Sequence, residues 1–344
     1  MELDLEYDES KGIYLLNKIR VLVLPKGSLE AIQNSVNTIL GLATKGIFYE
    51  VSSTVFYSFF QDLIKNKVIK GRGEDLEAKL FEVIKEMGLG RLNKINQDLN
   101  LYKISIEGNF NSFLNLIYDA PYCFNSNGLL TGIYRLITNK DVEVIETKCR
   151  TTGGSDADFF DINVSESKSQ YSYIPSIISN KENESLKKVE IIKDDVNISI
   201  NSIASEIIPV TYFPYLFSKL KSIIGPGVYG IESQAGKELA KLYQQYNLEL
   251  IVEKYGKEGL DVLPVISGMG RINTLKTELN YLIEVDVYNS FNALHIDDSM
   301  EKRCFLLGSL ISGLSYKLTG TSLKLSEKEC SATNGEVCKF AFEQ

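Results

Sequence analysis

Residues 327–338 have the sequence EKECSATNGEVC, and the positions of the acidic and cysteine residues indicate what kind of domain the chain builds. Glu327 precedes Cys330 by three residues, and Cys338 follows it by eight. The chain contains five cysteines, namely Cys123, Cys149, Cys304, Cys330 and Cys338. The first and second are 26 residues apart, and so are the third and fourth. This repeated spacing predicts that one unit occurs twice in the chain.

A shift of 181 residues superposes the two halves around these cysteines. The superposed pairs are Cys123 with Cys304, Cys149 with Cys330, and Glu146 with Glu327. The same shift places Ala157 at the position of Cys338. Upstream, where short insertions break the register, Asn111-Ser112-Phe113 resembles Asn289-Ser290-Phe291. A repeat this long predicts a duplicated domain, since solenoid units run to only about 20–50 residues.

The chain is expected to form two domains joined by a linker. Its 344 residues suit two medium-sized cores. We predict a first domain over residues 1–164, a linker over 165–187 and a second domain over 188–344. The linker prediction rests on a segment rich in Ser, Asn, Lys and Glu, with weak hydrophobic periodicity and with Pro175 inside it.

Both copies show the same order of expected elements. Each opens with an extended segment, over 12–25 and 196–209, in which β-branched and apolar residues dominate. Amphipathic helices follow, among them a pair over 55–65 and 236–246. Because strands and helices are mixed and do not strictly alternate, the predicted class is α+β, with an antiparallel sheet packed with helices in each domain.

The composition is that of a globular protein whose main partner is not an anionic polymer. Hydrophobic residues make up 44% and charged residues 24%, with a formal net charge of −8. An acidic chain is not expected to bind nucleic acid or an anionic membrane surface. No apolar run approaches the length of a membrane span, and the N-terminus is acidic where a signal peptide would be basic. We therefore expect a cytoplasmic protein, in which thiols stay reduced and clustered cysteines bind metal.

The second copy is expected to hold a structural zinc ion. Thiolate and carboxylate ligands suit zinc, and the set Cys304, Glu327, Cys330 and Cys338 would close a four-ligand shell. Residues three apart in a flat strand point to opposite faces, so Glu327 and Cys330 require a bend or bulge between them. The alternatives are Glu329 as the carboxylate ligand, packing cysteines without a metal, or a disulfide between Cys330 and Cys338.

The first copy departs from this pattern where Ala157 replaces a cysteine. Its possible ligands are Cys123, Glu146 and Cys149, and the carboxylates of Asp156 and Asp158 flank the gap. One interpretation is a site that is decaying after duplication, with a weaker or absent metal. The other is a three-ligand zinc with a bound water, which would be a catalytic arrangement.

The cysteine pattern resembles the 4-vinyl-reductase domain family, in particular the sensory domains of phenol-responsive bacterial activators. The resemblance implies zinc beside a buried pocket for a small, mostly apolar ligand, with folds related to TRAPP-type subunits and haem-nitric-oxide-binding domains. It places the segments of Tyr212, Phe213, Tyr229 and Tyr243 in the pocket wall, although core packing is the alternative role for each. His295, the single histidine, is a candidate pocket residue or a hydrogen-bonded structural residue.

Three classes of function follow from these observations. The first is a cytoplasmic small-molecule-binding or sensory protein that receives a small apolar or aromatic ligand and acts through a protein partner or as a homodimer. The second is a structural adaptor resembling TRAPP-type subunits. The third is a zinc-dependent enzyme or reductase, but no cofactor fingerprint or convincing proton donor supports it. We predict no catalytic residue.

Overall fold

The computed structural model contains three antiparallel sheets. It describes residues 3–114, 122–152, 155–168, 172–179, 186–200, 203–245, 268–278, 281–294, 304–319, 324–334 and 337–343. The helices are α1 (Ser28–Leu40), α2 (Thr44–Lys65), α3 (Gly73–Glu86), α4 (Phe124–Thr138), α5 (Tyr212–Ile224), α6 (Val228–Gln245), α9 (Phe305–Thr319) and α10 (Ser331–Asn334). Short 3-10 turns are η1 (Gly41–Ala43), η2 (Arg150–Thr152), η3 (Gly225–Gly227) and η5 (Phe291–Ala293). This mixture of helices and antiparallel sheets confirms the predicted α+β class.

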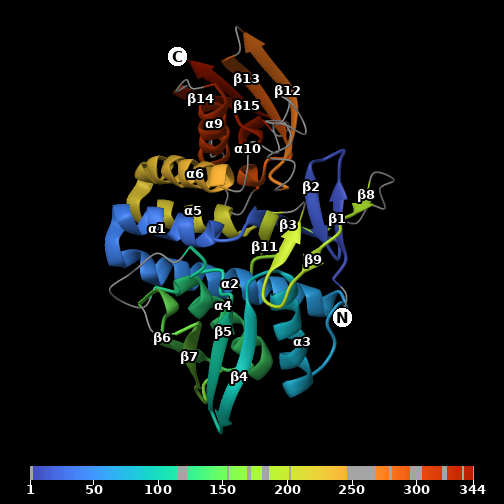
Figure 1. The fold of residues 1–344 in the computed structure, drawn as a ribbon, viewed down its shortest axis with the longest axis vertical. Coiled ribbons are helices and arrows are strands. Elements are labelled where there is room, and N and C mark those ends of the chain that lie inside the picture. The colour runs from blue at the N-terminus through green and yellow to red at the C-terminus, as the bar shows by residue number, and fades with distance from the viewer. Residues whose placement is uncertain are drawn as a thin grey trace.

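Two four-stranded sheets of identical topology lie at opposite ends of the molecule, with α1, α2, α5 and α6 between them (Figure 1). The first contains, in spatial order, β4 (Arg91–Asp98), β5 (Leu101–Glu107), β7 (Ala157–Val164) and β6 (Val142–Lys148). The second contains β12 (Arg271–Glu278), β13 (Tyr281–Tyr288), β15 (Val337–Glu343) and β14 (Lys324–Glu329). Within the described residues, each half therefore repeats the same sheet order.

The third sheet is shared between the halves, which the sequence did not predict. Its order is β8 (Leu186–Lys188), β1 (Leu5–Asp8), β2 (Ile13–Leu16), β3 (Ile19–Pro25), β11 (Ile203–Pro209), β10 (Ile198–Ile200) and β9 (Ile192–Lys193). The two extended segments expected from the sequence meet here, because β3 pairs with β11 through residues such as Val23 and Ile207. Nearly all residues of both strands are buried, which explains their continuous apolar sequences.

Part of the predicted linker packs against the first half. Ile178 forms an isolated bridge with Ile19, and the Tyr173 hydroxyl donates a hydrogen bond to the buried carboxylate of Asp62. Strand β8 extends the shared sheet beside β1. The domain boundaries themselves stay a prediction.

The central helices pack across the halves. Helix α1 lies against α6, and α5 lies against α2, whereas α2 with α4 and α6 with α9 are pairs within one half. The pair within the first half is close because α4 carries glycine at the contact. A Cβ atom on Gly132 would lie 2.8 Å from the carbonyl oxygen of Ser53 on α2. Glycine is therefore required where these two helices touch.

Glu206 of β11 caps the N-terminus of α1, which belongs to the other half. Its carboxylate accepts hydrogen bonds from the backbone N–H groups of Gly27 (3.0 Å) and Leu29 (2.9 Å). A carboxylate at a helix N-terminus satisfies unpaired donors and complements the helix dipole. Burial nevertheless raises the pKa of Glu206 to about 7.

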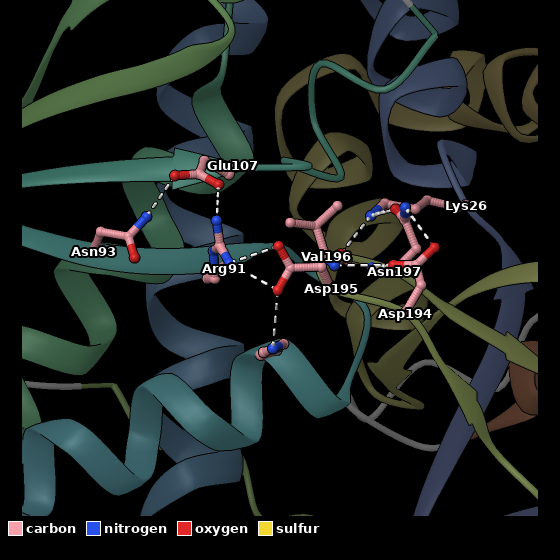
Figure 2. Close-up of polar contacts among 9 residues, drawn as sticks. Lys26, Arg91, Asn93, Glu107, Asp194, Asp195, Val196 and Asn197 are labelled. Atoms are coloured by element: carbon pink, nitrogen blue, oxygen red, sulfur yellow. Dashed lines mark hydrogen bonds and ion pairs between the residues drawn. The ribbon is translucent and has the colours of Figure 1, made fainter.

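A second set of polar contacts holds the turn between β9 and β10 against the first half (Figure 2). Asp195 accepts two hydrogen bonds of 2.8 Å from Arg91, which also pairs with Glu107. The buried Lys26 donates to Asn197 at 2.6 Å, and its burial lowers its pKa to about 8. The shared sheet, the cap and this turn together join the halves.

Within the described residues, no helix combines the length and apolar character needed to cross a membrane.

Candidate metal centres

Four candidate ligands of the second half converge at one end of its sheet. Cys304 immediately precedes α9, Glu327 lies on β14, Cys330 follows β14, and Cys338 lies on β15. One ligand atom from each lies within 4.8 Å of all the others. The Cys304 Sγ is 3.7 Å from that of Cys330 and 3.2 Å from that of Cys338. All three cysteines are fully buried. We call this group the second centre.

A β-bulge brings Glu327 and Cys330 to the same side. The pairing of β14 with β15 shifts register between Glu327 and Glu329, so the bulge expected from the sequence is confirmed. Glu329 points to solvent and forms an ion pair of 2.9 Å with Lys339. Glu327 is therefore the carboxylate of the second centre, and Glu329 is not.

The distances in the second centre fit a tetrahedral metal ion better than a disulfide. Zn–S bonds of about 2.3 Å place two sulfurs of a tetrahedron about 3.8 Å apart. A disulfide requires about 2.05 Å, and all five cysteines are free. Three thiols and a carboxylate form a donor set that zinc prefers.

The electrostatics of the second centre also favour a cation. Burial raises the pKa of the Cys304 thiol well above its ordinary value and that of Glu327 to about 8. Hydrogen bonds from Cys304, Cys330 and Ser331 lower the pKa of Cys338 to about 3. A bound cation would compensate the buried negative charge that these ligands carry as anions.

An equivalent group, the first centre, lies in the first half. It contains Cys123, Glu146, Cys149 and Asp158, again with ligand atoms within 4.8 Å of one another. The sulfurs of Cys123 and Cys149 are 3.6 Å apart. The pairing of β6 with β7 shifts register directly after Glu146, as β14 does after Glu327. The Glu146 Oε2 accepts a hydrogen bond from the Cys123 N–H, whereas its buried Oε1 has no hydrogen-bond partner among the described residues.

The fourth position of the first centre belongs to Asp158, which corrects the alignment that placed Ala157 there. Asp158 pairs with Ile106 on β5, as Cys338 pairs with Val287 on β13. Its side chain is fully buried, while Ala157 is only partly buried. The loop before β7 is one residue longer than the loop before β15, so a fixed shift of 181 fails beyond the loop. Asp156 is exposed and lies outside the group.

Three donors orient the Asp158 carboxylate. Oδ1 accepts a hydrogen bond from the Arg150 N–H (2.6 Å), and Oδ2 accepts from Asn109 Nδ2 (2.8 Å) and Ser112 Oγ (2.7 Å). In the second centre, the Cys338 sulfur accepts the N–H of Ser331 at 3.3 Å. Arg150 and Ser331 each directly follow the second cysteine of their centre, so the same backbone group orients the fourth ligand in both.

The predicted pocket residues lie mostly in packed surroundings. Tyr212, Phe213 and Tyr243 are buried, and the Phe213 ring centroid lies 6.0 Å from that of Phe291. Tyr229 is partly buried, with its ring centroid 4.7 Å from that of Phe305. His295 lies outside the described residues. A pocket formed by these residues stays a prediction.

Two shallow pockets among the described residues contain none of these aromatic side chains. One has a volume of about 340 Å³ and lies beside Tyr7 and Tyr14, and the other, of about 200 Å³, lies beside Asp141 and Val142. Both lie away from the two centres.

A buried polar network that the sequence analysis missed connects the halves near the first centre. The Tyr212 hydroxyl on α5 donates to Asn125 Oδ1 on α4, which also accepts from Ser52 Oγ at 2.9 Å. Asn125 Nδ2 and Asn111 Nδ2 both donate to Gln33 Oε1, at 2.8 and 3.2 Å. The signal in the sequence was FNSNG at 124–128, where polar residues begin an otherwise apolar helix.

A family model and several solved structures resemble parts of the chain. The model of the 4-vinyl-reductase domain matches residues 110–159, a range that contains all four residues of the first centre. No curated protein matches the chain.

Three solved structures are similar. The phenol-responsive sensory domain of the transcription activator PoxR, solved with phenol, is 18% identical, with a TM-score of 0.39 over 44% of this chain and 80% of that one. A trafficking protein particle complex subunit 3 from Naegleria fowleri, covalently bound to palmitic acid, is 15% identical, with a TM-score of 0.35 over 42% and 98%. A vinyl-4-reductase family protein from Methanocaldococcus jannaschii is 22% identical, with a TM-score of 0.26 over 40% and 92%.

Proposed function

From the 4-vinyl-reductase domain match over residues 110–159, we propose that the chain is a cytoplasmic small-molecule-binding regulatory protein. In this proposal it is built from two copies of that domain, the second of which spans residues 188–344 and holds a structural zinc ion. The observation that carries the proposal is the pair of buried thiol and carboxylate groups at equivalent positions of two sheets with the same order.

The proposed role of zinc is to hold the end of the second half together. The ligand-bearing segments begin α9, end β14 and begin β15, so one ion would join three elements. Four buried protein ligands leave no open position for water, which is typical of a structural site. When bound, zinc supplies positive charge to an otherwise anionic buried group. Structural zinc contributes on the order of 10 kcal/mol to folding.

The proposed regulatory role rests on the resemblance to the 4-vinyl-reductase domain family. That resemblance implies a small apolar or aromatic ligand near the zinc and a protein partner that receives the signal. Native mass spectrometry of the purified protein, with metal analysis, tests both parts. We expect zinc and a mass increment or thermal shift with an added small phenol. A protein that holds zinc but shows no shift with any phenol would contradict the sensory role and leave the structural role standing.

A structural adaptor is the second candidate, because the halves are joined as a dimer would be. Helices α1 and α5 each pack on the opposite half, and β3 pairs with β11 between them. An adaptor would be a monomer that binds no small molecule but retains its zinc. The same mass measurement therefore separates the two candidates.

A further inference from the structure

The two centres share a frame and differ in one ligand. Both contain two cysteines 26 residues apart and a glutamate placed by a bulge. The fourth ligand is a thiol in Cys338 and a carboxylate in Asp158. Both accept a hydrogen bond from the backbone of the residue after the second cysteine. The carboxylate therefore occupies the place of the thiol, which distinguishes this group from one that has simply lost a ligand.

Asp158 retains capacity for one cation. An ionised carboxylate offers about four acceptor positions. Asn109 and Ser112 occupy two on Oδ2, and the Arg150 N–H occupies one on Oδ1. The remaining position on Oδ1 belongs to a group whose ligand atoms lie within 4.8 Å of one another.

Glu146 provides an independent sign of a missing partner. Its Oε1 is buried and has no hydrogen-bond partner among the described residues, although its Oε2 is bonded to the Cys123 N–H. A buried acceptor without a partner costs about 1–3 kcal/mol. Glu327 occupies the matching place in the second centre, where we propose that zinc binds.

We propose that the first centre is an exchangeable site for a divalent cation, held by Cys123, Cys149, Glu146 and Asp158. This inference rests on the proposed function, since it assumes that the second centre is a zinc site. With one thiolate fewer, the first centre binds zinc more weakly and releases it faster, and it accepts harder divalent ions such as Co²⁺ more readily relative to zinc. The two centres thus differ in role, one structural and one responsive to metal supply.

Metal release from the full-length protein tests the proposal. The protein is loaded with Zn²⁺ or Co²⁺ and mixed with a coloured chelator, and release is followed in time. We expect two phases, of which only the fast one disappears in Cys123→Ser. With Co²⁺, thiolate-to-metal charge-transfer absorption is expected from both centres, and the part that Cys123→Ser removes is the smaller.

Three substitutions examine the role of Asp158. Asp158→Cys restores three thiols and is expected to merge the fast phase with the slow one. Ser112→Ala removes one hydrogen bond that positions Asp158 and is expected to lower the metal affinity of the first centre about tenfold, since ligand-orienting partners have effects of this size. Asp156→Asn is the matched control, because Asp156 is an exposed neighbour outside the group, and it should change neither phase.

The outcomes separate this inference from the proposed function. A single slow phase, unchanged by Cys123→Ser and Asp158→Cys, would show one zinc in the second centre and overturn the exchangeable site alone. A protein with no slow phase, whose metal content is unaffected by Cys338→Ser, would overturn the structural zinc as well. Equal release rates from two occupied centres would also contradict the proposal.

Discussion

The two halves build the same frame around different interiors. At the centres, Cys338 of the second half is matched by Asp158 of the first. On the helix that follows the first cysteine, Asn125 of α4 corresponds to Leu306 of α9, since each is the second residue of its helix. Both side chains are fully buried. The first half is thus polar where the second is apolar, which indicates that the copies have separate roles.

The difference between the centres predicts the largest effect. Cys304→Ser removes a ligand of the proposed structural zinc, and Cys123→Ser removes the equivalent ligand of the weaker centre. We expect Cys304→Ser to lose several kcal/mol of unfolding free energy, out of about 10 kcal/mol for structural zinc, and Cys123→Ser to lose clearly less. Urea unfolding of both variants with zinc present measures this. Equal losses would remove the distinction between a structural and an exchangeable centre.

The next effect concerns pH and a carboxyl group of the first half alone. Glu30 on α1 is fully buried, and the third residue of the equivalent helix α5 is Pro214. Burial, then the nearby Glu206 and Asp158, raises the pKa of Glu30 from 4.5 to about 8, against hydrogen bonds from the backbone of residues 113 and 114.

Between these values the folded protein binds a proton that the unfolded chain has lost. The contribution of Glu30 is therefore fully present below pH 4.5 and is lost as the pH rises to about 8. Glu30→Gln should flatten this part of the stability profile by an amount on the order of a few kcal/mol. Thermal unfolding from pH 5 to 9 measures the slope, and an unchanged slope would show that Glu30 does not titrate in this range.

A smaller effect is expected at the polar contact between the halves. Tyr212→Phe removes the hydroxyl that donates to Asn125 and contacts Ser52 at 3.0 Å. We expect a loss of about 1–2 kcal/mol, because Asn125 Oδ1 keeps its bond from Ser52. Tyr316→Phe is the control, since that side chain is 53% exposed on α9. A loss no larger than that of the control would mean that the network does not stabilise the contact.

Local sequence patterns were sufficient to predict the bulges and the ligand groups. Glu327 and Cys330 are three residues apart, and only an irregular strand brings both to one side, as the register shift confirms. The choice of Glu327 over Glu329 followed from the match with Glu146 and agrees with the exposed ion pair of Glu329.

The sequence could not reveal insertions that fall inside variable loops. One extra residue before β7 moved the fourth ligand from Ala157 to Asp158. Upstream, Phe110 and not Phe113 matches Phe291, because the N–H groups of Phe110 and Phe291 bond to the carbonyl groups of Leu89 and Met269. Backbone pairing fixes these equivalences, whereas residue identity alone misleads when similar residues are neighbours.

The contact between the halves was also beyond the sequence. Apolar alternation predicts that β3 and β11 are strands, but pairing partners far apart in the chain leave no local mark. The Glu206 cap and the Tyr212 network depend on that pairing, so they could not be predicted before it was known.

Zinc content and thermal stability, measured together on wild type and Cys330→Ser, test the central claim most directly. We predict that the wild-type protein contains zinc that Cys330→Ser loses, with a large fall in the unfolding temperature. Unchanged metal content and unchanged stability in Cys330→Ser would contradict the structural zinc centre.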